Sequence, residues 1–106
     1  MSFQRDYHAT FMTKSGPNTG NGLHFNHSLW THDGKTNLLH DPSDKDGLSL
    51  LARQWIAGLC AHAPALSALC SPTVNCYRRM HTTFAPDRAD WRVDCRLAAF
   101  RIKNLR

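Results

Sequence analysis

The clearest pattern of polar and apolar positions in the first half of the chain runs from Asn18 to Trp30. Asn18–Gly22 is a polar loop in which Gly20 and Gly22 allow positive φ and a close approach of a ligand to the bare backbone. Leu23–Trp30 then has the period of an extended strand, which sends alternate side chains to opposite faces. The two predicted faces are His24, Asn26 and Ser28 on one side, and Leu23, Phe25, His27 and Leu29 on the other.

Two interpretations of this segment follow from its residues. Imidazole, amide and hydroxyl groups in a row beside a glycine loop provide the chemistry that a phosphate or metal-nucleotide site needs. Alternatively, the segment is one arm of an ordinary hairpin with its polar face in solvent. Asp33-Gly34 within Thr31–Lys35 favours a tight turn, and Leu23–Trp30 and Asn37–His40 would be the two arms. The residues alone leave both interpretations open.

Short elements are predicted on either side of this hairpin. Tyr7–Met12 is rich in strand-forming residues and predicts a short strand. Thr13–Pro17 ends in Gly-Pro and predicts a turn that leads into the glycine loop. Asp41–Gly47 is polar and contains proline and glycine, so we expect a mobile connector on the surface.

Helical periodicity begins at Leu48. The apolar positions that recur on one helical face are Leu51, Trp55, Ile56, Leu59 and Cys60. This spacing predicts a helix over Leu48–His62, preceded by candidate N-caps or first-turn charges at Ser43, Asp44 and Asp46. Pro64 either starts a second short helix, Pro64–Leu69, or kinks the first one.

The last third of the chain reads as mostly non-helical. Ser71-Pro72 is expected to end the helical region, Thr73–Met80 to be extended or a turn, and His81–Asp90 to be an irregular loop. Arg96–Ile102 alternates imperfectly and predicts a strand. The predicted fold is therefore α+β, with an antiparallel sheet that carries the site residues and is backed by the helix over Leu48–His62.

Composition narrows the class of partner. The 106 residues suit one small domain with a modest core. The formal net charge is +5, and all eight acidic residues are aspartate. The positive charge is spread without a Lys/Arg cluster, so we expect anionic small substrates such as a carboxylate or phosphate, and no nucleic acid. No apolar run approaches a membrane span, so no membrane partner is expected.

The cysteines indicate a reducing compartment. Cys60, Cys70, Cys76 and Cys95 form no C-x-x-C pair, and the N-terminus has no secretory signal. We therefore expect free thiols and a cytoplasmic location. A zinc site is disfavoured because His62 near Cys60 is followed by no second pair at ligand spacing.

Several stretches are weak signals individually but specific in their common order and spacing. They are His8-Ala9-Thr10-Phe11-Met12 with Lys14, Gly20–Trp30, Gly58 with His62-Ala63-Pro64-Ala65-Leu66, Pro72-Thr73-Val74-Asn75-Cys76-Tyr77-Arg78-Arg79, Ala85-Pro86, and Arg96 with Ala98-Ala99-Phe100-Arg101-Ile102. Together they resemble the middle of the catalytic domain of glutamine synthetases, from His8 to Arg101. The resemblance makes residues 1–106 a partial catalytic domain that lacks the N-terminal domain and the C-terminal remainder.

The resemblance implies ATP-dependent condensation of glutamate with ammonia through a γ-glutamyl phosphate. It implies Mg²⁺ or Mn²⁺ and ATP as cofactors, and a homo-oligomer, for a full-length protein. The residues that match functional positions are Gly20 and Arg79 for the glutamate substrate, His24 for metal, Asn26, Ser28 and Arg101 for the nucleotide, and Arg79 and Arg96 for catalysis. Arginine forks suit both carboxylate and phosphate. For Arg79 and Arg101, a surface salt bridge is the alternative that the residues alone favour.

The chain also departs from the family pattern. Asn26 stands where the family commonly has a second histidine, Cys76 replaces a usual serine, and Asp94 lies where the ligases usually have an arginine. Thr83-Phe84 precede Ala85-Pro86, so the flap is one residue shorter and lacks the family's glutamate. The loss of a group that helps deprotonate ammonium typically costs about 10²–10⁴-fold in rate.

The sequence contains no glutamate residue, which limits the metal binding and catalysis expected of these 106 residues alone. The family's other metal ligands are glutamates, and hard divalent cations prefer several carboxylate oxygens. We therefore expect no ligase activity and no bound cofactor from these residues alone, and exposed apolar surface where neighbouring strands are missing. Met1-Ser2-Phe3-Gln4, Asn26-His27-Ser28-Leu29-Trp30 and Cys76 resemble the lengsin-like branch of the family, which lacks the ligase activity. Three functions remain open: a glutamate–ammonia ligase, a non-catalytic assembly protein of the lengsin-like branch, and a γ-glutamyl ligase for another amine.

Overall fold

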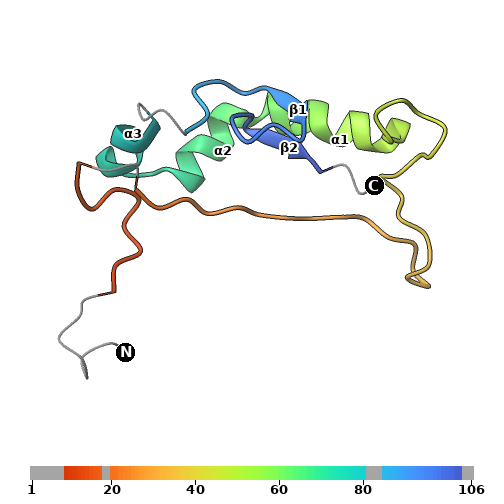
Figure 1. Cartoon of the computed structure of the whole chain (residues 1–106), viewed down its shortest axis with the longest axis horizontal. Helices are drawn as coiled ribbons and strands as arrows, with labels where there is room; N and C mark the ends of the chain where they lie inside the picture. Colours follow the sequence, from red (N-terminus) through yellow and green to blue (C-terminus); the bar gives the residue numbers. More distant parts are fainter. Residues whose placement is uncertain (1–8, 18–19, 81–84, 104–106) are drawn as a thin grey trace.

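The computed structural model describes residues 9–17, 20–80 and 85–103. Within them three helices precede two short strands: α1 (Leu50–Ala61), α2 (Ala63–Cys70), α3 (Val74–Met80), β1 (Trp91–Val93) and β2 (Phe100–Ile102). The helices follow one another along the long axis of the molecule, and an extended segment runs beneath them (Figure 1). None of the described helices is long and apolar enough to cross a membrane.

Helix α1 begins at the residue that caps it. The Ser49 hydroxyl accepts a hydrogen bond from the Ala52 amide at 3.1 Å and donates one to the Leu38 carbonyl at 2.7 Å. Ser43, Asp44 and Asp46, the predicted N-caps, lie too far upstream, so that prediction is wrong. The helix itself, predicted over Leu48–His62, is confirmed with slightly narrower bounds.

The buried face of α1 differs from the predicted one. Ala52 and Ile56 are buried with Leu48 and pack against Leu39, Cys60 and Ile102. Leu51 and Trp55 are exposed although the apolar pattern assigned them to the core. The small core therefore lies between α1, the chain around Leu39 and the end of β2.

The loop before α1 is organised by one carboxylate. Asp44 accepts hydrogen bonds from the backbone N–H groups of Asp46 and Leu48, at 3.0 and 3.2 Å, and from Arg53 of α1 at 2.8 and 2.9 Å. The Asp41 N–H donates to the Gly47 carbonyl at 3.1 Å and closes the loop. The predicted connector at residues 41–47 is thus a closed turn that is fastened to the helix it precedes.

Helix α2 agrees with its prediction and α3 does not. Pro64 lies in the first turn of α2, where a proline costs no hydrogen bond. Thr73–Met80 is helical over Val74–Met80, so the prediction of an extended segment or turn is wrong. The Thr73 carbonyl accepts from the Cys76 amide at 2.9 Å, and Arg78 and Arg79 in the last turn complement the helix dipole.

The sheet is parallel, which corrects the predicted antiparallel arrangement. β1 pairs with β2 in the register Trp91↔Phe100, Arg92↔Arg101 and Val93↔Ile102. Asp94 has φ 50°, and its N–H donates to the Ile102 carbonyl at 2.9 Å. This left-handed residue turns the chain back so that residues 94–99 return it to the start of β1. The strand predicted over residues 96–102 is limited to β2, and β1 was not predicted.

The predicted hairpin exists only around its turn. Gly34, with φ 69°, donates its N–H to the Thr31 carbonyl at 2.8 Å, and an antiparallel bridge joins Trp30 to Asn37. The rest of the predicted strand, residues 23–29, is extended without a ladder among the described residues. The strand predicted over residues 7–12 is absent at 9–12, and Tyr7 and His8 lie outside the described residues.

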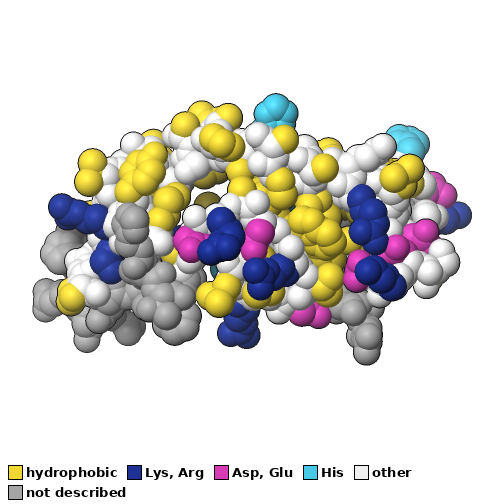
Figure 2. Space-filling view, turned by 90° about the horizontal axis from the view of Figure 1, so that it is seen from above, with side chains coloured by type: hydrophobic (Ala, Val, Ile, Leu, Met, Phe, Trp, Pro, Cys, Tyr) yellow, Lys and Arg dark blue, Asp and Glu magenta, His cyan; other side chains and the backbone are white. Residues whose placement is uncertain are grey.

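Much apolar surface is exposed, as the sequence predicted. Leu23 is 97% exposed and Phe25 86%, and Phe11 is similarly open. The radius of gyration is 17.2 Å, whereas a compact domain of about 100 residues has about 13 Å. Figure 2 shows hydrophobic side chains open between interspersed Lys, Arg and Asp on the upper face, with no single basic patch there.

Replacement of the observed cap should weaken α1, whereas replacement of a predicted cap should not. Ser49→Ala removes the acceptor for the Ala52 amide and should cost about 1 kcal/mol. Ser43→Ala is the matched control, because the Ser43 hydroxyl only contacts Asp41 within the loop. Hydrogen exchange of the Ala52 amide should accelerate in the first variant alone. Equal exchange in both variants would contradict the assigned cap.

Acid should loosen the start of α1 through Asp44. Hydrogen bonds from the Leu48 N–H and then from Arg53 hold the pKa of this carboxyl below its usual value of 3.8. Because folding lowers the pKa of Asp44, its carboxylate stabilises the loop at pH values above the unfolded-state pKa. This stabilisation is lost as the pH falls through roughly 4 toward the folded-state pKa.

Asp44→Asn should therefore weaken the loop at neutral pH and flatten this acid dependence. The measurement is the exchange protection of the Leu48 amide against pH, corrected for intrinsic rates. Asp46→Asn is the control, because its carboxylate makes one longer contact, 3.4 Å, with Arg53. An unchanged acid dependence in Asp44→Asn would exclude Asp44 as its source.

Candidate functional site

The glycine loop is held against the chain that precedes it. Gly20 has φ 85°, and a Cβ there would overlap the carbonyl oxygen of Thr13. The Asn21 N–H donates to that carbonyl at 2.9 Å, and the Asn21 side-chain amide donates to the Met12 carbonyl at 2.8 Å. The prediction of positive φ is confirmed at Gly20. Gly22 lacks a positive φ, so for that residue the prediction is wrong.

Gly22 is approached closely by a side chain of the protein itself, whereas the sequence predicted the approach of a ligand. A Cβ on Gly22 would lie 2.7 Å from a terminal guanidinium nitrogen (Nη2) of Arg79, which stands in the last turn of α3. The guanidinium therefore rests against bare backbone. Gly20 and Arg79, to which the resemblance assigns one substrate, are thus brought to the same loop. A guanidinium fork beside bare backbone is suited to a carboxylate.

A buried thiol joins α3 to the segment before the glycine loop. Cys76 Sγ lies 3.2 Å from the Thr13 hydroxyl and 3.1 Å from the Thr73 hydroxyl, and Cys76 is 7% exposed. The hydroxyl of Thr13, followed by that of Thr73, lowers the pKa of the thiol. The sequence marked Cys76 only as a replacement for serine. No local pattern indicates its contact with Thr13, which is 63 positions away.

The polar row of the extended segment is exposed. His24, Asn26 and Ser28 all lie on the surface, and the Ser28 hydroxyl accepts a hydrogen bond from the Trp30 indole at 2.8 Å. Among residues 9–17, 20–80 and 85–103, no group of three or more His, Cys, Asp or Glu side chains is placed to hold a metal ion. His24 therefore has no complete ligand set within the described part of the chain.

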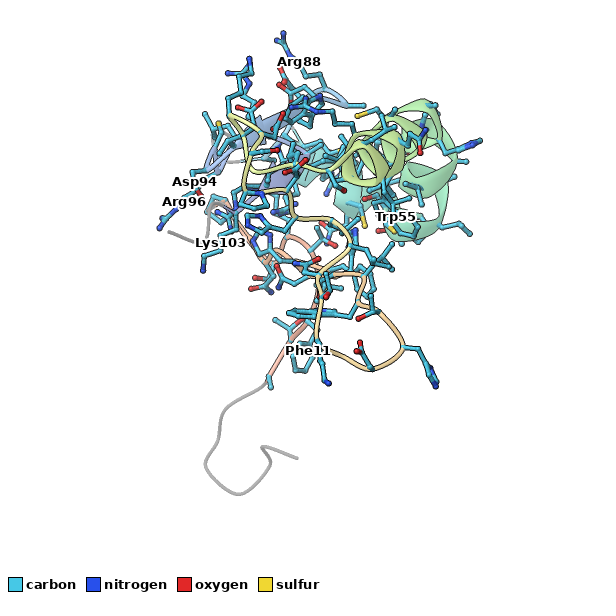
Figure 3. The ribbon with its side chains drawn as sticks, turned by 90° about the vertical axis from the view of Figure 1, so that its right-hand side faces the viewer. Phe11, Trp55, Arg88, Asp94, Arg96 and Lys103 are labelled. Carbon is cyan, nitrogen blue, oxygen red and sulfur yellow. The ribbon has the colours of Figure 1, made fainter. Side chains whose placement is uncertain are left out.

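His27 fastens the extended segment to α1. Its Nε2 accepts a hydrogen bond from the Trp55 indole at 2.8 Å, which assigns the ring proton of neutral imidazole to Nδ1. Phe25 stacks on the same imidazole with ring centroids 5.6 Å apart. Figure 3 shows Trp55 beside the helices. The sequence did not predict this bond, which joins residues 28 positions apart.

The remaining candidate arginines belong to the β1–β2 unit. Arg101 is exposed in β2 and is the register partner of Arg92, which pairs with Asp90 at 3.1 Å. Arg96 is exposed in the loop between the strands, and Figure 3 shows it on the outer side near Asp94 and Lys103. Two predicted phosphate-facing arginines thus share one small unit. The predicted flap residues Thr83-Phe84 lie outside the described residues.

Comparison with known proteins identifies what this chain is similar to. A family model described as the catalytic domain of glutamine synthetase matches residues 1–106. The "Glutamate–methylamine ligase" of Methyloversatilis universalis is 52% identical over 77% of this chain and 19% of its own length. The glutamine synthetases of Sulfolobus acidocaldarius and Thermotoga maritima are 48% and 40% identical over 89% and 100% of the chain, or 20% and 24% of theirs. The chain thus spans about a fifth to a quarter of these relatives.

Alanine at Gly20 should displace the glycine loop. A side chain there has an unfavourable positive φ and meets the Thr13 carbonyl, so the expected cost is about 1–3 kcal/mol. Gly16→Ala is the matched control, because a Cβ on Gly16 meets nothing within 4 Å. Exchange of the Asn21 amide hydrogen, which binds Thr13, should accelerate only in Gly20→Ala. Protection that survives in this variant would contradict the loop geometry.

Proposed function

Because the chain belongs to the family of the glutamine synthetase catalytic domain, we propose that the natural protein carrying it is an ATP-dependent ligase that joins glutamate to an amine. The observation that carries this proposal is the Arg79 guanidinium against the backbone of Gly22. A carboxylate can bind there through the guanidinium fork, and glutamate supplies that group. The names of the relatives, glutamine synthetase and glutamate–methylamine ligase, support the same reaction class.

In the proposed reaction, the chain's own residues bind and neutralise anions. Arg79 and the Gly20 loop hold the glutamate carboxylate. Arg96 and Arg101 oppose the negative charge of the phosphoryl group supplied by ATP, since phosphoryl transfer depends chiefly on positioning and on positive charge near the equatorial oxygens. Asn26 and Ser28 are proposed to hydrogen-bond the nucleotide.

The described residues do not fit a divalent cation without further ligands. His24 is one neutral nitrogen donor, whereas Mg²⁺ and Mn²⁺ prefer several oxygens, and no group of three potential ligands lies near it among the described residues. We therefore propose that the carboxylates for such an ion come from other parts of a longer homo-oligomeric protein located in the cytoplasm. No step of the reaction is assigned to a metal held by these residues.

Two amines, ammonia and a small alkylamine, are candidate substrates of the proposed ligase. A non-catalytic assembly protein is the alternative function. The 52% identity to a protein named glutamate–methylamine ligase favours a small alkylamine beside ammonia. The acidic Asp94 and the asparagine at position 26 weaken the phosphate side of the site and favour a non-catalytic assembly protein of the lengsin-like branch. Turnover separates these functions, because only a ligase couples ATP cleavage to the amine.

The test uses the full natural polypeptide that contains these residues. Phosphate release from ATP is measured with glutamate plus either ammonia or methylamine. Arg79→Lys should raise the glutamate KM by about 10- to 100-fold, because it removes a two-point charge-assisted contact. Arg78→Lys is the matched control, because Arg78 is exposed beside Arg79 on α3, and it should leave the glutamate KM unchanged.

The two functions predict different wild-type results. Release that requires methylamine or ammonia supports a ligase and identifies the amine by the larger kcat/KM. Wild-type protein that releases no phosphate with either amine contradicts the ligase proposal and leaves the assembly role. A glutamate KM that is equal in both arginine variants would contradict the assignment of the carboxylate to Arg79.

A further inference from the structure

Thr13 contacts both elements of the proposed carboxylate site, α3 and the glycine loop. Its hydroxyl lies 3.2 Å from Cys76 Sγ on α3, and its carbonyl accepts the Asn21 N–H at 2.9 Å. One half-buried residue thus contacts the helix that carries Arg79 and the loop that carries Gly22. Figure 1 shows the early part of the chain passing beside α3 at this point.

These contacts connect the two elements that carry Arg79 and Gly22. Cys76 and Arg79 are three residues apart on α3, so they lie on neighbouring positions of one helix face. Asn21 is adjacent to Gly22 in the chain. Thr13 therefore contacts Cys76, three residues from Arg79 on the helix, and Asn21, the residue next to Gly22 on the loop.

The Arg79 guanidinium lies close to the Gly22 backbone, because a methyl group on Gly22 would be 2.7 Å from its Nη2 atom. Among the described contacts, those of Thr13 with Cys76 and with Asn21 join the helix that carries Arg79 to the loop that carries Gly22. A misplacement of about 1 Å at such a site is enough to weaken binding strongly.

We propose that Thr13 is a positioning residue that sets the separation between the Arg79 guanidinium and the Gly20–Gly22 backbone, and thereby the affinity for the substrate carboxylate. The role rests on the proposed function, because the carboxylate is that of glutamate. Thr13 itself does not touch the substrate. Its hydroxyl fixes α3, and its carbonyl fixes the loop.

The test compares Thr13→Val with Thr13→Ser in the full natural polypeptide. Valine keeps the β-branched shape but removes the hydroxyl, whereas serine keeps the hydroxyl. Thr13→Val should raise the glutamate KM about 2- to 10-fold, the range expected for one neutral hydrogen bond, and leave kcat and the ATP KM within about twofold. Thr13→Ser should restore the glutamate KM.

A purely structural role predicts a different result. It would lower the melting temperature and the active fraction, and hence the apparent kcat, without a selective change in glutamate KM. An unchanged glutamate KM in Thr13→Val, an equal rise in the ATP KM, or a failure of serine to restore binding would each overturn the positioning role.

Cys76 reports the contact independently of catalysis. The Thr13 hydroxyl favours the thiolate, so its removal should move the pH profile of Cys76 alkylation to higher pH, and serine should reverse the shift. Peptide-resolved mass spectrometry separates Cys76 from the other cysteines.

The pair of measurements distinguishes two failures. If wild-type protein turns over normally and the Cys76 profile shifts without a change in glutamate KM, only the positioning role fails. If the profile shifts but wild-type protein shows no glutamate-dependent turnover, the proposed ligase function fails and the positioning role fails with it.

Discussion

The position of the extended segment depends on a few contacts, because residues 23–28 form no strand ladder within the described part of the chain. Asn21 fixes its start through the carbonyls of Met12 and Thr13. His27 fixes its middle by accepting the indole N–H of Trp55, and the Trp30–Asn37 bridge fixes its end. A backbone without a ladder must satisfy its polar groups with side chains or water. These few contacts therefore determine where every candidate residue between them lies.

The same contacts divide the candidate site into two parts of unequal completeness. In the part proposed to bind the carboxylate, the Gly20 loop, Thr13 and α3 bring Arg79 against Gly22. The phosphate part is dispersed over two exposed elements, the extended segment and the β1–β2 unit. Phosphoryl transfer depends on positive charges that converge on the phosphoryl oxygens. The proposed phosphate site would therefore need groups outside the described residues.

The sequence predicted those features that depend on local physics. Apolar spacing with a period of 3.6 residues predicted α1, Pro64 indicated the start of α2 as one of two alternatives, and Gly20 indicated a position with positive φ. α3 was missed because valine and tyrosine suggest an extended chain, while the contact between Cys76 of this helix and Thr13 is non-local.

The parallel sheet was missed for a related reason. It depends on the positive φ of Asp94, and no short-range pattern distinguishes it from an antiparallel return. The departures from the family pattern, Asn26 and Asp94, fall in the dispersed phosphate part, whereas Gly20 and Arg79 in the carboxylate part match. Carboxylate recognition requires only a guanidinium and backbone that are already in contact, but phosphoryl transfer requires several charges to converge. In the proposed ligase, loss of one charge would therefore impair catalysis before glutamate binding, so binding alone would not distinguish a ligase from a non-catalytic relative.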